Sequence, residues 1–361
     1  MMKRSTEPIH VAFCSDAGYI PQLAAALVSL FISNWKNELV VYVVTTGLTA
    51  SNRAALEKLA LTFGRSLNFH DLDASPLMGL AEYVQPQSTY YRLLLPSLLP
   101  SVPRLIYLDC DLVVEIDLHE LWQSAQQNNL VLGVAERDEL QPGLQAHVGT
   151  PGDSYINAGV IVMDLEAWRR EDVAAKCLTW LKANPTIATM MDQDAINRVC
   201  MGRKGYVALK WNLNPIHGPA RVTLTQFPAR ILHFAGPLKP WHEWYCHDLA
   251  EIFYRYLEKS ETGFSVKKIE ATKLGQHLST ANQHWERGKL MQAGRHYMTI
   301  AHLMTHGKAD LAPLVRHCVQ VANLAMTRGE HEQACNHYRA LVVHWGLPVD
   351  HMDIYKIPLI R

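Results

Sequence analysis

The sequence predicts an α/β fold in which a mostly parallel sheet carries helices on both faces and is followed by a small all-α domain. Apolar β-branched segments alternate with helical ones over the first 262 residues, which is typical of a sheet covered on both faces. Beyond them strand patterns stop and helical spacing takes over. The 361 residues suit one large and one small domain at roughly 150 residues each. We therefore expect domains at 1–262 and 263–361.

Each element of the first domain follows from its own pattern. The expected elements are strands at 9–15, 38–46, 66–72, 104–114, 129–136, 155–165 and 229–236, and helices at 19–31, 51–63, 118–128, 165–185 and 193–200. Ser51 is the expected N-cap of its helix, because its hydroxyl can accept from a first-turn N–H. Ligands of such sheets bind beyond the carboxyl ends of the strands, which places Cys14, Ser15 and Asp16 at a binding edge.

Composition narrows the class of protein. Hydrophobic residues make up 48% and charged residues 19% of the chain, which excludes a disordered or fibrous protein. Seven cysteines without a C-x-x-C pair indicate a reducing compartment and no structural zinc. The charged start leads directly into a strand without a signal-peptide core, and no apolar run of about 18 residues suggests a membrane span. We expect a cytoplasmic protein with no nucleic-acid partner.

The tail differs from the first domain in charge and pattern. From residue 263 it holds 12 Lys and Arg against 7 Asp and Glu, and ten of the 18 histidines. Five positions recur after 41 residues, pairing 281 with 322, 285 with 326, 288 with 329, 293 with 334 and 297 with 338. This spacing resembles the helical hairpins of tetratricopeptide repeats, and generic hairpins are the alternative.

Hairpins of this kind cannot bury their apolar face alone. We expect them to pack on the first domain, on each other or on a second copy, as in a homodimer. The basic excess predicts at most a weak peripheral contact with an anionic membrane surface, at about 1 kcal/mol per basic residue. A solvated surface of mixed charge is the alternative.

The strongest local signal is Asp109-Cys110-Asp111, directly after the apolar segment LIYL. Two carboxylates one residue apart at a strand end can hold the same hard divalent cation, which would neutralise a diphosphate. Acid pairs at strand ends are often only solvated turns. Here the flanking apolar residues make uncompensated charges costly, which favours a ligand.

Two further positions can serve the same chemistry. His233 ends an apolar strand and would complete a ligand set that suits Mn²⁺, which accepts mixed oxygen and imidazole ligands. Lys239, in the loop after it, can contact a phosphate as a point charge. The alternatives are a structural histidine and an exposed loop lysine.

Two clusters of amide and acid side chains complete the candidates. Asp192 and Gln193 stand at a helix start, where the first-turn N–H groups favour Asp, so Asp192 could be only an N-cap. Asn157 lies in YINAGV, where small residues let the backbone approach a ligand closely. The alternative is a turn that leads into a strand.

Six segments carry a family resemblance. They are VAFCSDAGY, TYYRLLLPSLLP, RLIYLDCDLVV, YINAGVIVMDLEAWR, DQDAIN and HFAGPLKPWH, in this order over residues 9–245. Together they resemble glycosyltransferase family 8, which includes bacterial lipopolysaccharide galactosyl- and glucosyltransferases and glycogenin. The resemblance implies a GT-A fold, a UDP-sugar donor, Mn²⁺ or Mg²⁺, and retention of anomeric configuration.

The resemblance also implies roles for single residues. The cation would be held at Asp109, Asp111 and His233. Matches to donor-binding positions are Cys14, Ser15 and Asp16 for uridine, Arg92 for the donor and a nearby loop, Cys110 between the paired acids, Asn157, Asp192 and Gln193 around the sugar, and Gly236 and Lys239 at the diphosphate. The catalytic candidates are Gln193 and Asp192. An amide is a poor nucleophile, so we expect front-face departure and attack, with Gln193 stabilising the oxocarbenium-like centre.

Three features depart from the family pattern. Gly18 stands where many members carry a polar side chain, Asp138 is only a loosely aligned candidate for an acceptor-side acid, and the tail is not part of the family core. We predict transfer of galactose or glucose from a UDP-sugar to a bacterial surface glycan or glycolipid precursor. A sugar nucleotidyltransferase is one alternative, although CSDAGYIP lacks its Gly-rich phosphate loop. An inactive scaffold that acts through the tail is the other.

Overall fold

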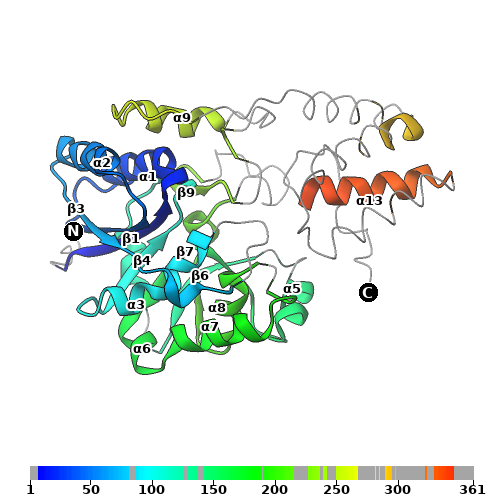
Figure 1. Cartoon of the computed structure of the whole chain (residues 1–361), viewed down its shortest axis with the longest axis horizontal. Helices are drawn as coiled ribbons and strands as arrows, with labels where there is room; N and C mark the ends of the chain where they lie inside the picture. The colour runs from blue at the N-terminus through cyan, green and yellow to red at the C-terminus, as the bar shows by residue number, and fades with distance from the viewer. Residues whose placement is uncertain are drawn as a thin grey trace. The chain divides into compact units, whose positions relative to one another are not determined.

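The computed structural model divides into two compact units (Figure 1). The first comprises residues 1–235 and 252–266, and the second comprises 236–251 and 267–361. The structure describes residues 7–80, 87–125, 128–136, 138, 141–188, 190–214, 227–235, 239–241, 249–266, 281, 284, 289–294, 297, 322 and 329–344. Among them, no helix is both long and apolar enough to cross a membrane.

A seven-stranded sheet with the order β3-β2-β1-β4-β7-β6-β8 forms the centre of the first unit. Its strands are β1 (Ile9–Asp16), β2 (Leu39–Thr46), β3 (Leu67–Asp71), β4 (Arg104–Leu108), β6 (Val131–Ala135), β7 (Ile156–Asp164) and β8 (Lys204–Tyr206). Strands β3, β2, β1 and β4 run parallel, whereas β7 runs antiparallel to β4 and β6. The predicted mostly parallel sheet is confirmed, with β7 as the reversed strand.

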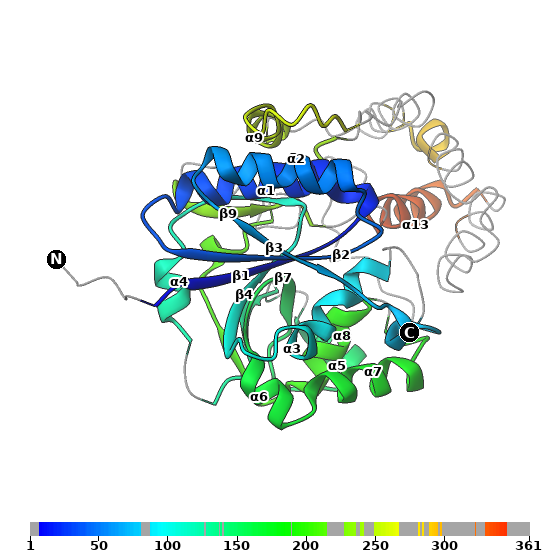
Figure 2. The same cartoon turned by 60° about the vertical axis from the view of Figure 1, so that its left-hand side comes forward.

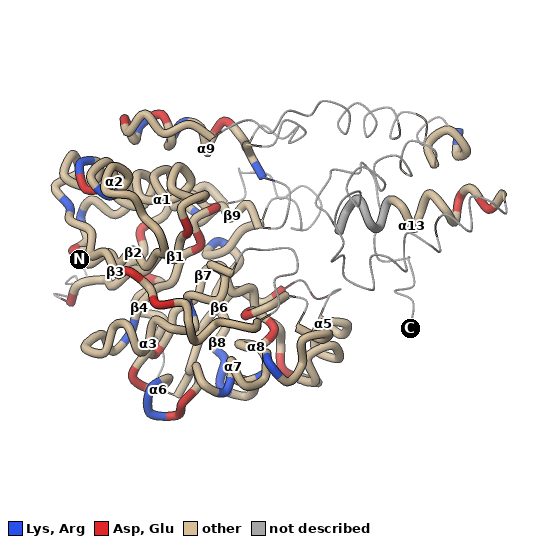
Figure 3. Tube along the Cα trace, viewed as in Figure 1, with Lys and Arg blue, Asp and Glu red and all other residues tan. Residues whose placement is uncertain are grey.

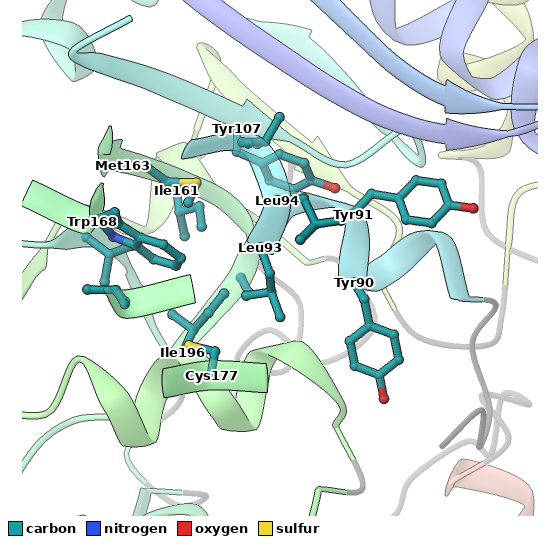
Figure 4. Packing of buried hydrophobic residues seen from close by; sticks show 14 of the residues in the cluster. Tyr90, Tyr91, Leu93, Leu94, Tyr107, Ile161, Met163, Trp168, Cys177 and Ile196 are labelled. Carbon is teal, nitrogen blue, oxygen red and sulfur yellow. The ribbon is translucent and has the colours of Figure 1, made fainter. Parts of the chain in front are cut away.

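Helices cover both faces of this sheet (Figure 2). On one face lie α1 (Ile20–Ser33) and α2 (Ala50–Thr62), and on the other lie α3 (Leu95–Leu98), α6 (Leu165–Arg170), α7 (Val173–Ala183) and α8 (Asp192–Val199). Helix α1 is buried along most of its length because its small residues let it pack closely. On the second face, Leu93, Trp168 and Ile196 belong to one apolar core (Figure 4).

A second, two-stranded sheet pairs β5 (Leu112–Glu115) with β9 (Arg230–His233). The sequence predicted one continuous strand over 104–114, where the structure has the two separate strands β4 and β5. This prediction was wrong. The chain ends β4 at Leu108, leaves the main sheet at Asp109 and Asp111, and starts β5 in a different sheet. Charged side chains at this point cannot be buried in a continuous apolar strand. Helix α1 links the two sheets, because the Val114 N–H donates to Ser29 Oγ at 2.8 Å.

Three predicted helix boundaries were also wrong. The N-cap of α2 is Thr49, whose Oγ1 accepts from the Asn52 N–H, and not Ser51. The helix expected over 165–185 breaks into α6 and α7 at Asp172, whose backbone is left-handed with φ of 52°. The helix expected over 118–128 is the short α4 (His119–Gln123). The structure adds α5 (Gln141–Val148), β8, α9 (Ala250–Glu258) and the 3-10 helices η1 (Ala17–Tyr19), η2 (Ser75–Leu77), η3 (Gln87–Leu94) and η4 (Leu209–Trp211), which no pattern predicted.

In the second unit the described residues are mostly helical, with α13 (His331–His344) as its longest described helix. Six described members of the 41-residue spacing are fully buried, namely Ala281, Ala293, Tyr297, Ala322, Ala334 and Tyr338, whereas Gly329 is exposed. Burial of small and aromatic residues at these positions is what a helical hairpin requires. Repeat ancestry and the boundary at 262 stay predictions.

The last turn of α6 carries two neighbouring arginines, Arg169 and Arg170, and blue basic residues are visible at α6 in Figure 3. Arg169 donates to the carbonyls of Pro96, Leu99 and Val102 at 3.1, 3.2 and 3.0 Å. Arg169→Met should lower the free energy of unfolding by about 1.5–3 kcal/mol, because these carbonyls lose a charged donor. The exposed neighbour Arg170 pairs with the adjacent Glu171 at the surface, so Arg170→Met should change the free energy of unfolding by no more than about 0.5 kcal/mol. Equal midpoints of urea unfolding for the two variants would contradict this account.

Candidate active site

The candidate site lies at the carboxyl ends of β1 and β4. These strands are parallel neighbours, so the residues that follow them meet at one edge of the sheet. The Cys110 Sγ–H donates to the Cys14 carbonyl at 3.3 Å, which ties the two strand ends together. Burial raises the pKa of both thiols, so neither is a thiolate at neutral pH. The two cysteines hold the backbone that carries the acids.

Asp109 and Asp111 face a third potential ligand, His233. Ligand atoms of the three side chains all lie within 4.8 Å of one another. His233 Nε2 is 3.6 Å from Asp109 Oδ2 and 3.3 Å from Asp111 Oδ1. The register of the small sheet produces this approach, because Leu112 stands opposite His233 in the β5–β9 pair. The structure thus brings together the three residues that the sequence proposed as cation ligands.

The donor set fits a divalent cation. Two carboxylates and one imidazole are ligands that Mn²⁺ accepts. A formal count gives three carboxylates at this centre, Asp109, Asp111 and Asp192, against the single guanidinium of Arg92. A charge of +2 would balance the remaining two negative charges. The other ring nitrogen of His233 is engaged by Asn212 Oδ1 at 2.8 Å, which leaves Nε2 facing the carboxylates.

Arg92, from η3, is the buried cation at the centre of the site. Its Nη2 lies 2.9 Å from Asp109 Oδ1 and its Nε 2.8 Å from Asp192 Oδ2. Nη1 donates to the Ala158 carbonyl at 2.5 Å, and the Nε–H points to the Thr89 carbonyl at 3.1 Å. Burial by itself would lower the pKa of the guanidinium, but Asp109 and Asp192 raise it overall. Arg92 therefore stays charged while 4% exposed.

Asp192 begins α8 but is not its N-cap, since Met191 occupies that position with φ of 55°. The alternative that Asp192 only caps a helix is therefore wrong. Its Oδ1 accepts from Thr89 Oγ1 at 3.2 Å, whereas Oδ2 is ion-paired with Arg92 Nε at 2.8 Å and receives no further hydrogen bond from the described residues. Burial raises the pKa of Asp192 to about 6 against the opposing effect of Arg92. A carboxylate oxygen can accept more than one hydrogen bond, so Oδ2 can accept one from a hydroxyl group of a ligand beside its ion pair.

Gln193 has a fixed amide orientation. Its Oε1 accepts from the Ala158 N–H at 2.9 Å, and its Nε2 donates to Tyr155 Oη at 3.4 Å. The Tyr155 hydroxyl in turn donates to Asp194 Oδ1 at 2.5 Å, and burial raises the pKa of Asp194. The amide is placed beside β7 with no freedom to exchange its oxygen and nitrogen.

The remaining β1 residues are placed by local hydrogen bonds. Ser15 is buried and its Oγ donates to the Asp16 carbonyl at 3.0 Å. Asp16 Oδ1 accepts from the Gly18 N–H at 2.8 Å, and Oδ2 accepts from Ser88 Oγ at 2.7 Å. Gly18, the departure from the family pattern, therefore completes the turn that orients Asp16.

The structure does not test the roles predicted for three further residues. Lys239 is buried and belongs to the second unit, and Gly236 lies outside the described residues. Asp138 is exposed. Their roles stay predictions.

Several residues of the site were not singled out from the sequence. The Tyr107 hydroxyl donates to Asp109 Oδ1 at 2.7 Å, and its ring lies under Arg92 at 4.3 Å. Its position two residues before Asp109 on a strand places both on one face, a signal that could have found it. Thr89, Asn212 and Glu136 reach the site only through the fold and carry no local signal.

Gly159 is fixed by the closeness of the site to β7. A Cβ at this position would lie 2.1 Å from His233 Cε1 and 2.7 Å from Asp109 Oδ2. The Gly159 carbonyl also accepts from the Asp109 N–H at 2.8 Å. Any other residue would therefore displace two of the three candidate ligands.

The sequence and the fold are similar to those of known proteins. The sequence model described as Glycosyl transferase family 8 matches residues 10–245. General stress protein A of Bacillus subtilis (strain 168) is 26% identical over 271 residues, which cover 70% of this chain and 94% of that protein. Lipopolysaccharide 1,3-galactosyltransferase of Salmonella typhimurium is 23% identical over 303 residues, which cover 81% and 89%.

Among solved structures, the galactosyltransferase LgtC in complex with donor and acceptor sugar analogs is similar in fold. Its TM-score is 0.62 at 24% identity, and the match covers 73% of this chain and 99% of LgtC. At this identity the likeness concerns the fold.

Gly159→Ala should weaken binding of Mn²⁺ while the protein stays folded. The added methyl group must push His233 and Asp109 apart at a cost of about 1–3 kcal/mol, which corresponds to roughly a 5- to 150-fold loss of affinity. Isothermal titration of the metal-free protein with Mn²⁺ measures this. Gly143→Ala on α5, where a Cβ meets nothing within 4 Å, is the matched control and should bind as the wild type does. Unchanged affinity in Gly159→Ala would exclude a cation at these residues.

Proposed function

The chain belongs to glycosyl transferase family 8, and from this membership we propose that it is a metal-dependent, retaining hexosyltransferase that uses a UDP-sugar. Its GT-A-like fold and its hexosyltransferase class follow from the family and the relatives. Galactose or glucose is the proposed sugar. The observation that carries the proposal is the cluster of Asp109, Asp111 and His233 beside the buried Arg92.

The proposed cation is Mn²⁺ or Mg²⁺, held by Asp109, Asp111 and His233. Mn²⁺ is favoured because an imidazole accompanies the two carboxylates. When bound there, a divalent cation would supply positive charge for the diphosphate that leaves the sugar. Arg92 Nη2, 2.9 Å from Asp109 Oδ1, orients the Asp109 carboxylate at this position.

The chain's own residues would then bind and orient the donor. Cys14, Ser15 and Asp16 would contact the uridine at the end of β1, with Gly236 and Lys239 at the diphosphate. Asp192 Oδ2, which is buried and ion-paired with Arg92 Nε, would accept a further hydrogen bond from a sugar hydroxyl. Gln193 would face the anomeric centre and stabilise its developing positive charge, while the acceptor attacks on the side from which the diphosphate departs.

The proposed acceptor is a bacterial surface glycan or its lipid-linked precursor. The activity that names the Salmonella relative, lipopolysaccharide 1,3-galactosyltransferase, supports this class of acceptor, and LgtC was crystallised with donor and acceptor sugar analogs. We place the enzyme in the cytoplasm, where UDP-sugars are available. The tail after residue 262 would hold the acceptor, a second copy or an anionic membrane surface.

Two alternatives are less well supported. A nucleotidyltransferase would need a basic or Gly-rich phosphate loop after β1, but that position holds Asp16 in a turn with Gly18. An inactive scaffold would not need three ligands that converge within 4.8 Å. The cost of keeping three carboxylates close together favours a working site.

Metal dependence can be tested by donor hydrolysis. The purified protein, incubated with UDP-galactose or UDP-glucose and Mn²⁺, should release hexose slowly, stop with EDTA and recover when Mn²⁺ is restored. Asp109→Asn and Asp111→Asn should each slow turnover about a hundredfold or more, since a lost cation removes several kcal/mol of transition-state stabilisation. Asp71→Asn removes an exposed carboxylate on β3 that pairs with Arg53 and should leave turnover unchanged. Near wild-type turnover of either site variant at limiting Mn²⁺ would contradict the proposal that Asp109 and Asp111 hold a catalytic cation.

A substitution of Gln193 can show whether this residue acts in catalysis or only stabilises the fold. Gln193→Ala should slow transfer about a hundredfold, the scale of losing one oriented dipole at a reacting centre, and should retain UDP affinity. If Gln193 were only structural, loss of its bond from the Ala158 N–H would cost about 1 kcal/mol of stability and leave the rate unchanged. Asn184→Ala, which removes a bond to the Trp180 carbonyl at the end of α7, is the control for such a loss. Steady-state rates and melting temperatures of both variants decide between these outcomes.

A further inference from the structure

Behind His233 lies a chain of hydrogen-bonded side chains, here called the amide relay: Glu136, Asn157, Asn212 and His233. Asn157 Nδ2 donates to Glu136 Oε1 at 3.1 Å, and Asn212 Nδ2 donates to Asn157 Oδ1 at 2.9 Å. His233 Nδ1 lies 2.8 Å from Asn212 Oδ1. Asn212 is 5% exposed, so its amide must find its partners within the protein.

The orientation of each amide follows from groups that cannot change roles. The Gly159 N–H can only donate, and it points at Asn157 Oδ1 at 3.0 Å. The Glu136 carboxylate can only accept when ionised, and it receives Asn157 Nδ2. Asn157 is therefore fixed at both ends, and its oxygen faces Asn212. The atom of Asn212 that meets this oxygen must be the donor Nδ2, so Asn212 Oδ1 must face the imidazole.

The orientation of Asn212 determines which ring nitrogen of His233 carries the hydrogen. An oxygen acceptor 2.8 Å from Nδ1 requires a hydrogen on Nδ1. In a neutral imidazole the other nitrogen, Nε2, then carries the lone pair. Nε2 is the atom that faces Asp109 Oδ2 and Asp111 Oδ1. The relay thus selects the tautomer whose free lone pair points between the two carboxylates.

We propose that Asn212 is a positioning residue of the cation site, which acts by holding His233 in its Nδ1–H tautomer through the amide relay. The proposal rests on the proposed function in one respect, that a divalent cation binds at Asp109, Asp111 and His233. Asn212 comes from the end of η4, outside every segment that carried the family resemblance. Its contact with His233 adds orientation without touching the cation or the donor.

The fold keeps the relay in place from both sides. The Asn212 N–H donates to the Leu209 carbonyl at 3.0 Å, and the His233 N–H donates to the Leu213 carbonyl at 2.9 Å. The segment that carries Asn212 and the strand that carries His233 are therefore joined by backbone as well as side chains. Ring and amide meet in a geometry that exists before any ligand arrives.

The first experiment needs no substitution in the relay. In the metal-free, full-length protein labelled with ¹⁵N-histidine, the ring nitrogens of His233 are assigned by their disappearance in His233→Gln. At a pH where the ring is neutral, Nδ1 should be the protonated nitrogen. A predominant Nε2–H tautomer would overturn the proposal, whatever the variants do.

The second experiment measures Mn²⁺ affinity by isothermal titration of full-length variants. Asn212→Leu removes the acceptor and should weaken binding about 10- to 100-fold, the usual effect of losing the partner of a ligating histidine. Asn212→Asp keeps an oxygen for the Nδ1–H but sets a second carboxylate oxygen against Asn157 Oδ1, so it should recover part of this loss and bind between the wild type and Asn212→Leu. If Asn212→Leu does not fold, the comparison of Asn212→Asp with the wild type and the tautomer measurement still decide the proposal.

A matched control separates positioning from stability. Asn34 is another buried amide of the first unit, which donates to the Leu30 and Ile116 carbonyls and accepts from the Leu118 N–H. Asn34→Leu should lower the unfolding midpoint but leave Mn²⁺ affinity unchanged. Equal affinity of Asn212→Leu and wild type, or equal weakening by Asn34→Leu, would overturn the role of Asn212. Wild-type protein that binds no Mn²⁺ would instead remove the cation site itself, and with it both proposals.

Discussion

The guanidinium of Arg92 is buried between two carboxylates and a backbone carbonyl, and the site is assembled around it. Asp109 follows β4, Asp192 begins α8, and Ala158 lies in β7. A buried charge without partners is costly, and removing one partner of a buried pair typically costs about 3–5 kcal/mol. The three elements must therefore meet where Arg92 places them. Since Asp109 is shared between Arg92 and the cation cluster, the packing of the core and the geometry of the cluster are set by the same contact.

The second constraint is the close approach of β7 to the cluster of Asp109, Asp111 and His233. β7 passes so near the cluster that only glycine fits at position 159, and the backbone of the same strand binds Arg92, Asp109 and Gln193 through Ala158 and Gly159. An antiparallel strand between β4 and β6 supplies this surface. The backbone groups of Ala158 and Gly159 thus orient the Arg92 guanidinium, Asp109 and the Gln193 amide. This close contact explains why YINAGV has few bulky side chains.

Much of this architecture is visible in the sequence, and the limits are physical. Alternating apolar segments predicted β1 to β3 and the helices between them, because burial on both faces leaves a continuous apolar run. The same run cannot reveal direction, so the reversal of β7 was not predicted. The break between β4 and β5 was hidden because apolar residues flank Asp109 and Asp111 on both sides. Asn212 and Glu136 could not be found, since a neutral amide and a loop acid acquire meaning only through partners that the fold brings together.

The charge balance explains why an amide, and not a carboxylate, stands beside His233. In metalloproteins the second nitrogen of a ligating histidine often donates to a carboxylate, which fixes the ring and makes it more basic. Here Asp109, Asp111 and Asp192 already outnumber Arg92, and burial has raised the pKa of Asp192 to about 6. A fourth carboxylate in contact with the ring would deepen this excess and oppose ionisation of the others. In the amide relay, two amides separate the Glu136 carboxylate from His233. The carboxylate fixes which atom of each amide donates and which accepts, while its negative charge is kept away from the imidazole. The relay therefore orients His233 without adding a negative charge beside it. The site can bind a cation without further repulsion among Asp109, Asp111 and Asp192.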